Sequence, residues 1–170
     1  EIQIEDNNTV YFTNKIAAAT LNIDGGDVTF NDADNNIGRA DTDGLVNLAG
    51  APTIYLSTAI VDGETLWVAD ESAAGNAIDI SSDGATFKLP TNFTTGTITL
   101  LSQAAVSTKG AIGTENLDAE AALMSAHDTA LYDYTIASSG TGSINIDATV
   151  VEKSDAAKAT ALCVSNQRRL

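Results

Sequence analysis

One short phrase recurs through residues 44 to 101, and it limits the possible folds more than any other feature of the chain. Each copy is a small residue, an apolar residue, any residue and a second apolar residue, followed by a turn rich in Gly, Asp, Asn or Ser. This alternation gives each copy one apolar face, as in a half-buried β-strand. The copies occupy residues 44–48, 53–56, 65–68, 77–80, 86–89 and 97–100.

The spacing of the copies predicts a coil. Leu45, Leu66 and Phe87 are the first apolar residues of alternate copies and lie 21 residues apart, whereas Ile54, Ile78 and Ile98 are 24 and 20 apart. Two interleaved series with a period of about 21 residues are expected from a coil with two main strands per turn. We therefore predict an all-β fold, a right-handed parallel β-helix (solenoid) of about six turns with a C-terminal hairpin cap. A β-sandwich or jelly roll stays open as the alternative, because it also has many short strands.

The rhythm of the sequence changes after residue 106, and this change predicts three segments. Residues 1–106 form the coils, residues 107–152 form a cap, and residues 153–170 form an Ala-rich tail. Within the cap, we expect a short helix over 114–124 with Thr114 as its N-cap residue, and a hairpin of strands 129–136 and 143–151. The tail is interpreted as an amphipathic or frayed helix.

Composition excludes several classes of partner. The chain carries 23 acidic and 8 basic residues, a formal charge of −15, which disfavours nucleic acid and anionic membrane surfaces. No stretch approaches the roughly 18 to 20 apolar residues of a spanning helix. The single cysteine, Cys163, cannot form an internal disulfide, and we interpret it as a small buried apolar residue. A chain poor in Lys, Arg and Cys and rich in Thr, Asn, Asp, Gly and Ser is typical of bacterial secreted or surface proteins.

Two groups of residues are candidate contact surfaces. Ile2, Ile4, Val10 and Phe12 lie on the first two expected strands, which either begin the first coil or add as donor strands to a neighbouring subunit. Tyr55 and Trp67 occupy the third position of their phrases, so we expect them to face away from the core. They would then line an outer groove or form an exposed contact patch for subunits or ligands.

Calcium is the one cofactor that the sequence suggests. Asp32, Asp34, Asp41 and Asp43 place carboxylates in neighbouring turns, and the first part resembles the start of an EF-hand loop. Ile37 then stands where that loop requires glycine, and the last ligand position holds Asp43 instead of glutamate. The alternative interpretation is that these residues are solvated turn formers.

The sequence contains no catalytic signature, and we predict that the chain is not an enzyme. Any nucleophilic scheme would depend on His127, the only histidine. A carbohydrate-active enzyme would need basic residues beside a pair of acids on one face, but Arg39, Lys88 and Lys109 are scattered.

The segment 128–136, Asp-Thr-Ala-Leu-Tyr-Asp-Tyr-Thr-Ile, resembles the aromatic strand near the end of the β-helix in autotransporter passenger domains. The hairpin through 144–150 fits the C-terminal cap of those passengers, and the Ala-rich run 154–162 resembles the linker toward their translocator barrel. The resemblance implies export across two membranes and display or release outside the cell. Passenger functions range from adhesion to proteolysis, so no activity is implied.

These observations predict a non-catalytic, extracellular structural or adhesive module of a bacterial surface. The alternative is a self-assembling subunit of an extracellular filament or sheath, joined end to end or by donor-strand pairing. The expected partners are copies of the chain or a host or cell-surface ligand, without nucleic acid binding or membrane insertion.

Overall fold

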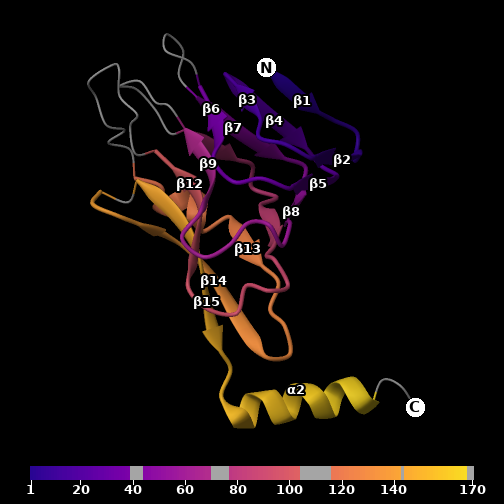
Figure 1. Cartoon of the computed structure of the whole chain (residues 1–170). Coiled ribbons are helices and arrows are strands. Elements are labelled where there is room, and N and C mark those ends of the chain that lie inside the picture. Colours follow the sequence, from indigo (N-terminus) through magenta and orange to yellow (C-terminus); the bar gives the residue numbers. More distant parts are fainter. Residues whose placement is uncertain (39–43, 70–76, 104–115, 143, 168–170) are drawn as a thin grey trace.

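The computed structural model describes residues 1–38, 44–69, 77–103, 116–142 and 144–167. Its strands wind around one core as three stacked sheets (Figure 1). Sheet A contains β1 (Ile2–Ile4), β4 (Thr20–Asp24), β7 (Leu45–Ala49) and β10 (Ile78–Ile80). Sheet B contains β2 (Thr9–Phe12), β5 (Asp27–Phe30), β8 (Thr53–Leu56), β11 (Ala85–Lys88) and β13 (Met124–Ala126). Sheet C contains β3 (Ala17–Ala18), β6 (Asn35–Ile37), β9 (Thr65–Ala69), β12 (Thr97–Ser102), β15 (Asn145–Glu152) and β14 (Tyr132–Ser139).

All neighbouring strands pair in parallel except in the C-terminal hairpin, where β15 is antiparallel to both β12 and β14. Consecutive strands enter sheets A, B and C in turn, so each coil contributes one strand to each sheet. The predicted parallel β-helix with a C-terminal hairpin is therefore confirmed, and the sandwich alternative is excluded.

The predicted stacking of the coils is wrong in detail. Leu45, Leu66 and Phe87 lie on β7, β9 and β11, in three different sheets, and Ile54, Ile78 and Ile98 are separated in the same way. The true column in sheet A is Ile2, Leu21, Val46 and Ile78, so successive coils advance by 19, 25 and 32 residues. The period of about 21 residues came from counting two strands per coil where there are three.

Sheet C is the sheet that the sequence pattern missed. Its strand β3 is an Ala-Ala pair and β6 is Asn-Asn-Ile, so neither shows the alternation of a half-buried strand. These strands form because the coil on the next level supplies their hydrogen-bonding partners, with Ala17 opposite Asn36 and Asn36 opposite Val68. Pairing with neighbouring coils overrides their weak intrinsic preference.

The corner between sheets A and B is tight because glycine lies there. Gly25 and Gly26 separate β4 from β5 at φ of +74° and +78°, and a Cβ on Gly26 would lie 2.2 Å from the Asn8 carbonyl oxygen. The corners also bond to one another along the stack, since the Gly25 N–H donates to the Ala49 carbonyl oxygen at 2.8 Å. Only glycine combines a positive φ with so close an approach of one coil to the next.

The core holds a row of aromatic rings along the coil axis. Phe12 packs on Phe30 with ring centroids 5.1 Å apart, and Trp67 lies between Phe30 and Phe87 at 5.5 and 6.0 Å in edge-to-face contacts. Trp67 is fully buried, so the prediction that it faces away from the core is wrong. The alternation breaks in β9, where Leu66 and Trp67 are buried in succession.

One buried amide links three coils. Asn35 of β6 is fully buried, and its Oδ1 accepts the Ile16 N–H at 2.9 Å. Its Nδ2 donates to the Asp32 carbonyl oxygen at 2.7 Å and to the Leu66 carbonyl oxygen at 3.0 Å. The side chain therefore satisfies backbone groups of the first, second and third coils, which a buried polar side chain requires.

Short elements cover the C-terminal end of the coil. Helix α1 is Asp118–Ala121, shorter than the helix predicted over 114–124, and Met124 at the end of that range begins β13. Thr114, the predicted N-cap residue, lies outside the described residues. Glu120 of α1 accepts the Ile80 N–H of β10 at 3.1 Å, while β13 adds to β11 and the hairpin adds to β12.

The tail forms α2 (Asp155–Gln167), which lies away from the coils beyond the hairpin (Figure 1). Lys158 ties its first turns to Glu152 of β15 at 2.5 Å. Cys163 is exposed on this helix, so its interpretation as a buried residue is wrong. None of the helices in the described ranges has the length and apolar character needed to cross a bilayer.

Candidate binding groove

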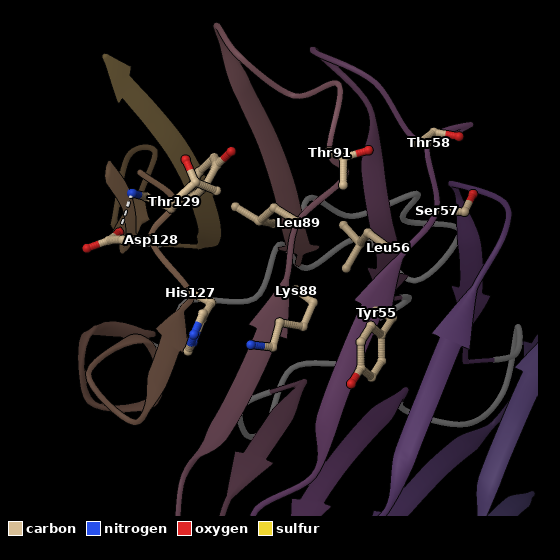
Figure 2. Close-up of a pocket in the computed structure, with 11 residues that line it drawn as sticks. Tyr55, Leu56, Ser57, Thr58, Lys88, Leu89, Thr91, His127, Asp128 and Thr129 are labelled. Carbon is tan, nitrogen blue, oxygen red and sulfur yellow. Dashed lines mark hydrogen bonds between the residues drawn. The ribbon is translucent and has the colours of Figure 1, made fainter. Parts of the chain in front are cut away.

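The largest concave feature to which the described residues contribute chemistry is a groove of about 400 Å³ between the outer face of sheet B and the cap (Figure 2). Its floor comes from the ends of β8 and β11, and its wall from the segment that joins β13 to β14. The lining residues are Tyr55, Leu56, Ser57, Thr58, Lys88, Leu89, Thr91, His127, Asp128, Thr129 and Tyr134.

Strand register places three of these side chains in a row. Lys88 pairs directly with Tyr55, and Ala126 pairs with Phe87, so His127 continues the row one coil further. Figure 2 shows Tyr55, Lys88 and His127 on three adjacent strands, with the Lys88 side chain extended toward His127. Tyr55 and Lys88 are half-buried and His127 is exposed, so all three are open to a ligand.

The wall of the groove is held by a fixed network. The Asp128 carboxylate accepts the Tyr134 N–H at 2.8 Å, and the Tyr134 hydroxyl donates to the Phe93 carbonyl oxygen at 3.1 Å. The Tyr134 and Phe93 rings stack with centroids 6.1 Å apart. Burial raises the pKa of the Tyr134 phenol above its usual value, so this donor stays protonated at neutral pH. Asp128 thus has a structural partner for its charge.

Lys88 differs from the other lysines in its electrostatic environment. Four lysines lie in the described part of the chain, and three of them form ion pairs: Lys15 with Asp34, Lys153 with Asp133, and Lys158 with Glu152. Their partners raise the pKa values of Lys153 and Lys158. Lys88 has no carboxylate partner among the described residues, although the chain as a whole carries a charge of −15.

The contact residues that the sequence suggested fall at two places. Tyr55 lines the groove, whereas Trp67 is inside the core and cannot contact a ligand or a subunit. Ile2, Val10 and Phe12 are partly buried at the N-terminal end of the coil, and Ile4 is buried within the core. There the exposed aromatic side chain is Tyr11, at 68% exposure, which the sequence analysis did not single out.

The suggested calcium ligands are not brought together by the described part of the structure. Asp34 is ion-paired with Lys15 at 3.1 Å, and the Asp32 carbonyl oxygen is occupied by Asn35. Asp41 and Asp43 lie outside the described residues. Within the described ranges, no three His, Cys, Asp or Glu side chains are close enough to hold a metal ion.

The sequence analysis missed the row Tyr55, Lys88 and His127 because it used the wrong period. Thr53-Ile54-Tyr55-Leu56 and Thr86-Phe87-Lys88-Leu89 are the same phrase with a 33-residue offset, and that offset is the true register of β8 with β11. Lys88, which we took to be isolated, therefore lies beside an aromatic ring.

The fold and groove define this chain as a parallel β-helix module with a C-terminal cap and an outer-face groove. Comparisons with protein-family models, with curated proteins and with solved structures found no match.

Proposed function

We propose that this chain is a non-catalytic structural or adhesive module of a bacterial cell surface, in which it ends an extracellular β-helix. The observation that carries this proposal is the difference between the two ends of the coil. The C-terminal end is covered by α1, β13 and the hairpin, whereas β1, β2 and β3 are each the outermost strand of a sheet. A coil with these two ends can add strands in one direction and is terminated in the other.

The resemblance to autotransporter passengers supports the same role. The aromatic strand that carries it is the segment leading into β14, and its Tyr134 packs on Phe93 and bonds to the Phe93 backbone. A cap anchored in this way protects the last coil from pairing with other chains. The acidic composition and the single cysteine also suit display outside the cell.

Surface display can be tested on cells that produce the protein from its own gene. An antibody against this chain should label intact cells, and brief treatment of those cells with an external protease should abolish the signal. A cytoplasmic marker protein in the same cells should stay unlabelled and uncut. Labelling that requires cell lysis would contradict the proposed location.

Self-assembly is the second candidate, and the uncovered N-terminal end favours it. The Asn8 and Phe12 carbonyl oxygens of β2 accept N–H groups from Asp27 and Asn31 of the next coil. Backbone groups alternate in direction along a parallel ladder, so those of Thr9 and Tyr11 point to the outer edge. Unpaired edge groups beside partly buried apolar side chains are suited to accept a strand from another copy.

We expect the wild-type chain to associate with increasing concentration and Tyr11→Pro to stay monomeric, because proline removes an outward N–H at an edge that tolerates it. Sedimentation velocity measures this, with Tyr11→Ala as the control that removes only the side chain. Electron microscopy then separates discrete pairs from filaments. Association of Tyr11→Pro equal to that of the wild type would exclude β2 as the pairing edge.

A further inference from the structure

We propose that the groove beside sheet B binds a small carboxylate whose body presents an apolar face, with Lys88 as the counter-charge. This inference does not depend on the proposed surface role, because it concerns the outer face of the coil and not its ends. It is carried by three observations made above: the unpaired ammonium of Lys88, the row of Tyr55, Lys88 and His127, and the concave shape of the site.

The charge of the groove selects the sign and number of charges on the ligand. Lys88 is half-buried and has no ion-pair partner in the described part of a strongly acidic chain, so an anion that reaches it gains an unshared cation. The imidazole of His127 lies next in the row and supplies a second polar nitrogen. The carboxylate of Asp128 is also part of the wall, so a multiply charged anion such as phosphate would meet repulsion there. One full cation and one imidazole match a single negative charge.

The walls of the groove select the body of the ligand. The Tyr55 ring, Leu56 and Leu89 present apolar surface on either side of Lys88. Ser57, Thr58, Thr91 and Thr129 place hydroxyl groups around the rim, where they can exchange hydrogen bonds with a polar ligand. A volume of about 400 Å³ lies within the range of small-molecule sites, and such sites combine apolar walls with a few polar groups.

Two kinds of compound carry this chemistry. One is a uronate unit of an acidic glycan, whose sugar ring has an apolar face and several hydroxyl groups. The other is a small aromatic carboxylic acid, whose ring would pack on Tyr55. Both share a single carboxylate next to a flat apolar surface, and this shared feature is the content of the proposal.

Isothermal titration calorimetry of the full chain tests the proposal with four probes. The carboxylates are trigalacturonate and 4-hydroxybenzoate, and their neutral counterparts are the methyl-esterified trisaccharide and 4-hydroxybenzamide. We expect at least one carboxylate to bind and its neutral counterpart to bind about 10-fold more weakly or worse, since a hydrogen bond to a charged group is lost. Binding of the sugar acid alone assigns the site to glycans, and binding of the aromatic acid alone assigns it to small aromatic acids.

Variants locate the binding in the groove. Lys88→Gln keeps the length of the side chain and removes its charge, so we expect about a 10-fold loss of affinity for the carboxylate. Tyr55→Ala should cost about fivefold through lost ring contact. Lys15→Gln, which removes an ion-paired lysine elsewhere on the coil, is the matched control and should leave affinity unchanged.

Thermal unfolding of each variant checks that the fold is intact, which we expect because Lys88 and Tyr55 lie on the outer face. Three results would overturn the proposal: neither carboxylate binds, a neutral counterpart binds as well as its acid, or Lys88→Gln binds like the wild type. Binding of inorganic phosphate as tightly as the carboxylate would also overturn the assignment to a singly charged ligand.

Discussion

Replacing Trp67 with alanine should lower the free energy of unfolding by about 3 to 5 kcal/mol, the usual cost of removing a large buried ring. Trp67 is fully buried and contacts both Phe30 and Phe87. Its loss would open a cavity in the middle of the aromatic row, where the coils above and below are fixed by backbone pairing and cannot close around it. Trp67→Phe should cost much less, because the Trp67 Nε1 is buried without a hydrogen-bond partner and phenylalanine removes that unpaired donor.

Denaturant titration followed by circular dichroism measures the change. Tyr11→Ala is the control, since that ring is 68% exposed and its removal should change stability by no more than about 0.5 kcal/mol. Equal stability of Trp67→Ala and Tyr11→Ala would show that the tryptophan is not part of the core. Such a result would restore the outward orientation that the strand pattern first suggested.

The second large effect is expected from Asn35→Ala, at about 3 to 5 kcal/mol. Alanine would leave the Ile16 N–H and the carbonyl oxygens of Asp32 and Leu66 without the partners described above. Each buried group left unsatisfied costs about 1 to 3 kcal/mol, and three such groups lie in one place. Asn35→Asp should be intermediate when the acceptor for Ile16 is kept, although it then places a charge in the core.

The neighbouring residue supplies the matched control for this prediction. Asn36 follows on the same strand, but its side chain is exposed, so Asn36→Ala should be neutral within about 0.5 kcal/mol. Amide hydrogen exchange at Ile16 gives a local readout, because its protection depends on the Asn35 carbonyl oxygen. Unchanged exchange at Ile16 in Asn35→Ala would mean that the amide does not link the coils.

The parallel β-helix could be predicted from the sequence because the strands of sheets A and B carry one apolar face each. Val46 and Leu48, or Ile78 and Ile80, are buried at alternate positions as the phrase implies. The number of strands per coil could not be predicted, because β3 and β6 are defined by pairing with other coils and not by their own side chains. Without sheet C, the copies of the phrase were assigned to the wrong neighbours.

The groove depended on that same missing information. Tyr55 could be placed on an outer face from its own strand, but Lys88 joins it only through a 33-residue register. His127 enters the row because β13 extends sheet B beyond the coils predicted from the sequence. The position of Trp67 had a local cause, since the consecutive burial of Leu66 and Trp67 departs from a period of two.

The increasing length of the coils has a consequence for how such a chain can be altered. β3 ends one residue before β4 begins, whereas seven residues separate β6 from β7 and eight separate β9 from β10. The glycine corner from sheet A to sheet B stays short, with two residues between β4 and β5 and three between β7 and β8. Added sequence has therefore accumulated at the opposite corner while the ladder stayed in register. Foreign peptides grafted after Ile37 or Ala69 should be carried by the scaffold without disturbing it, whereas grafts at Gly25 should not.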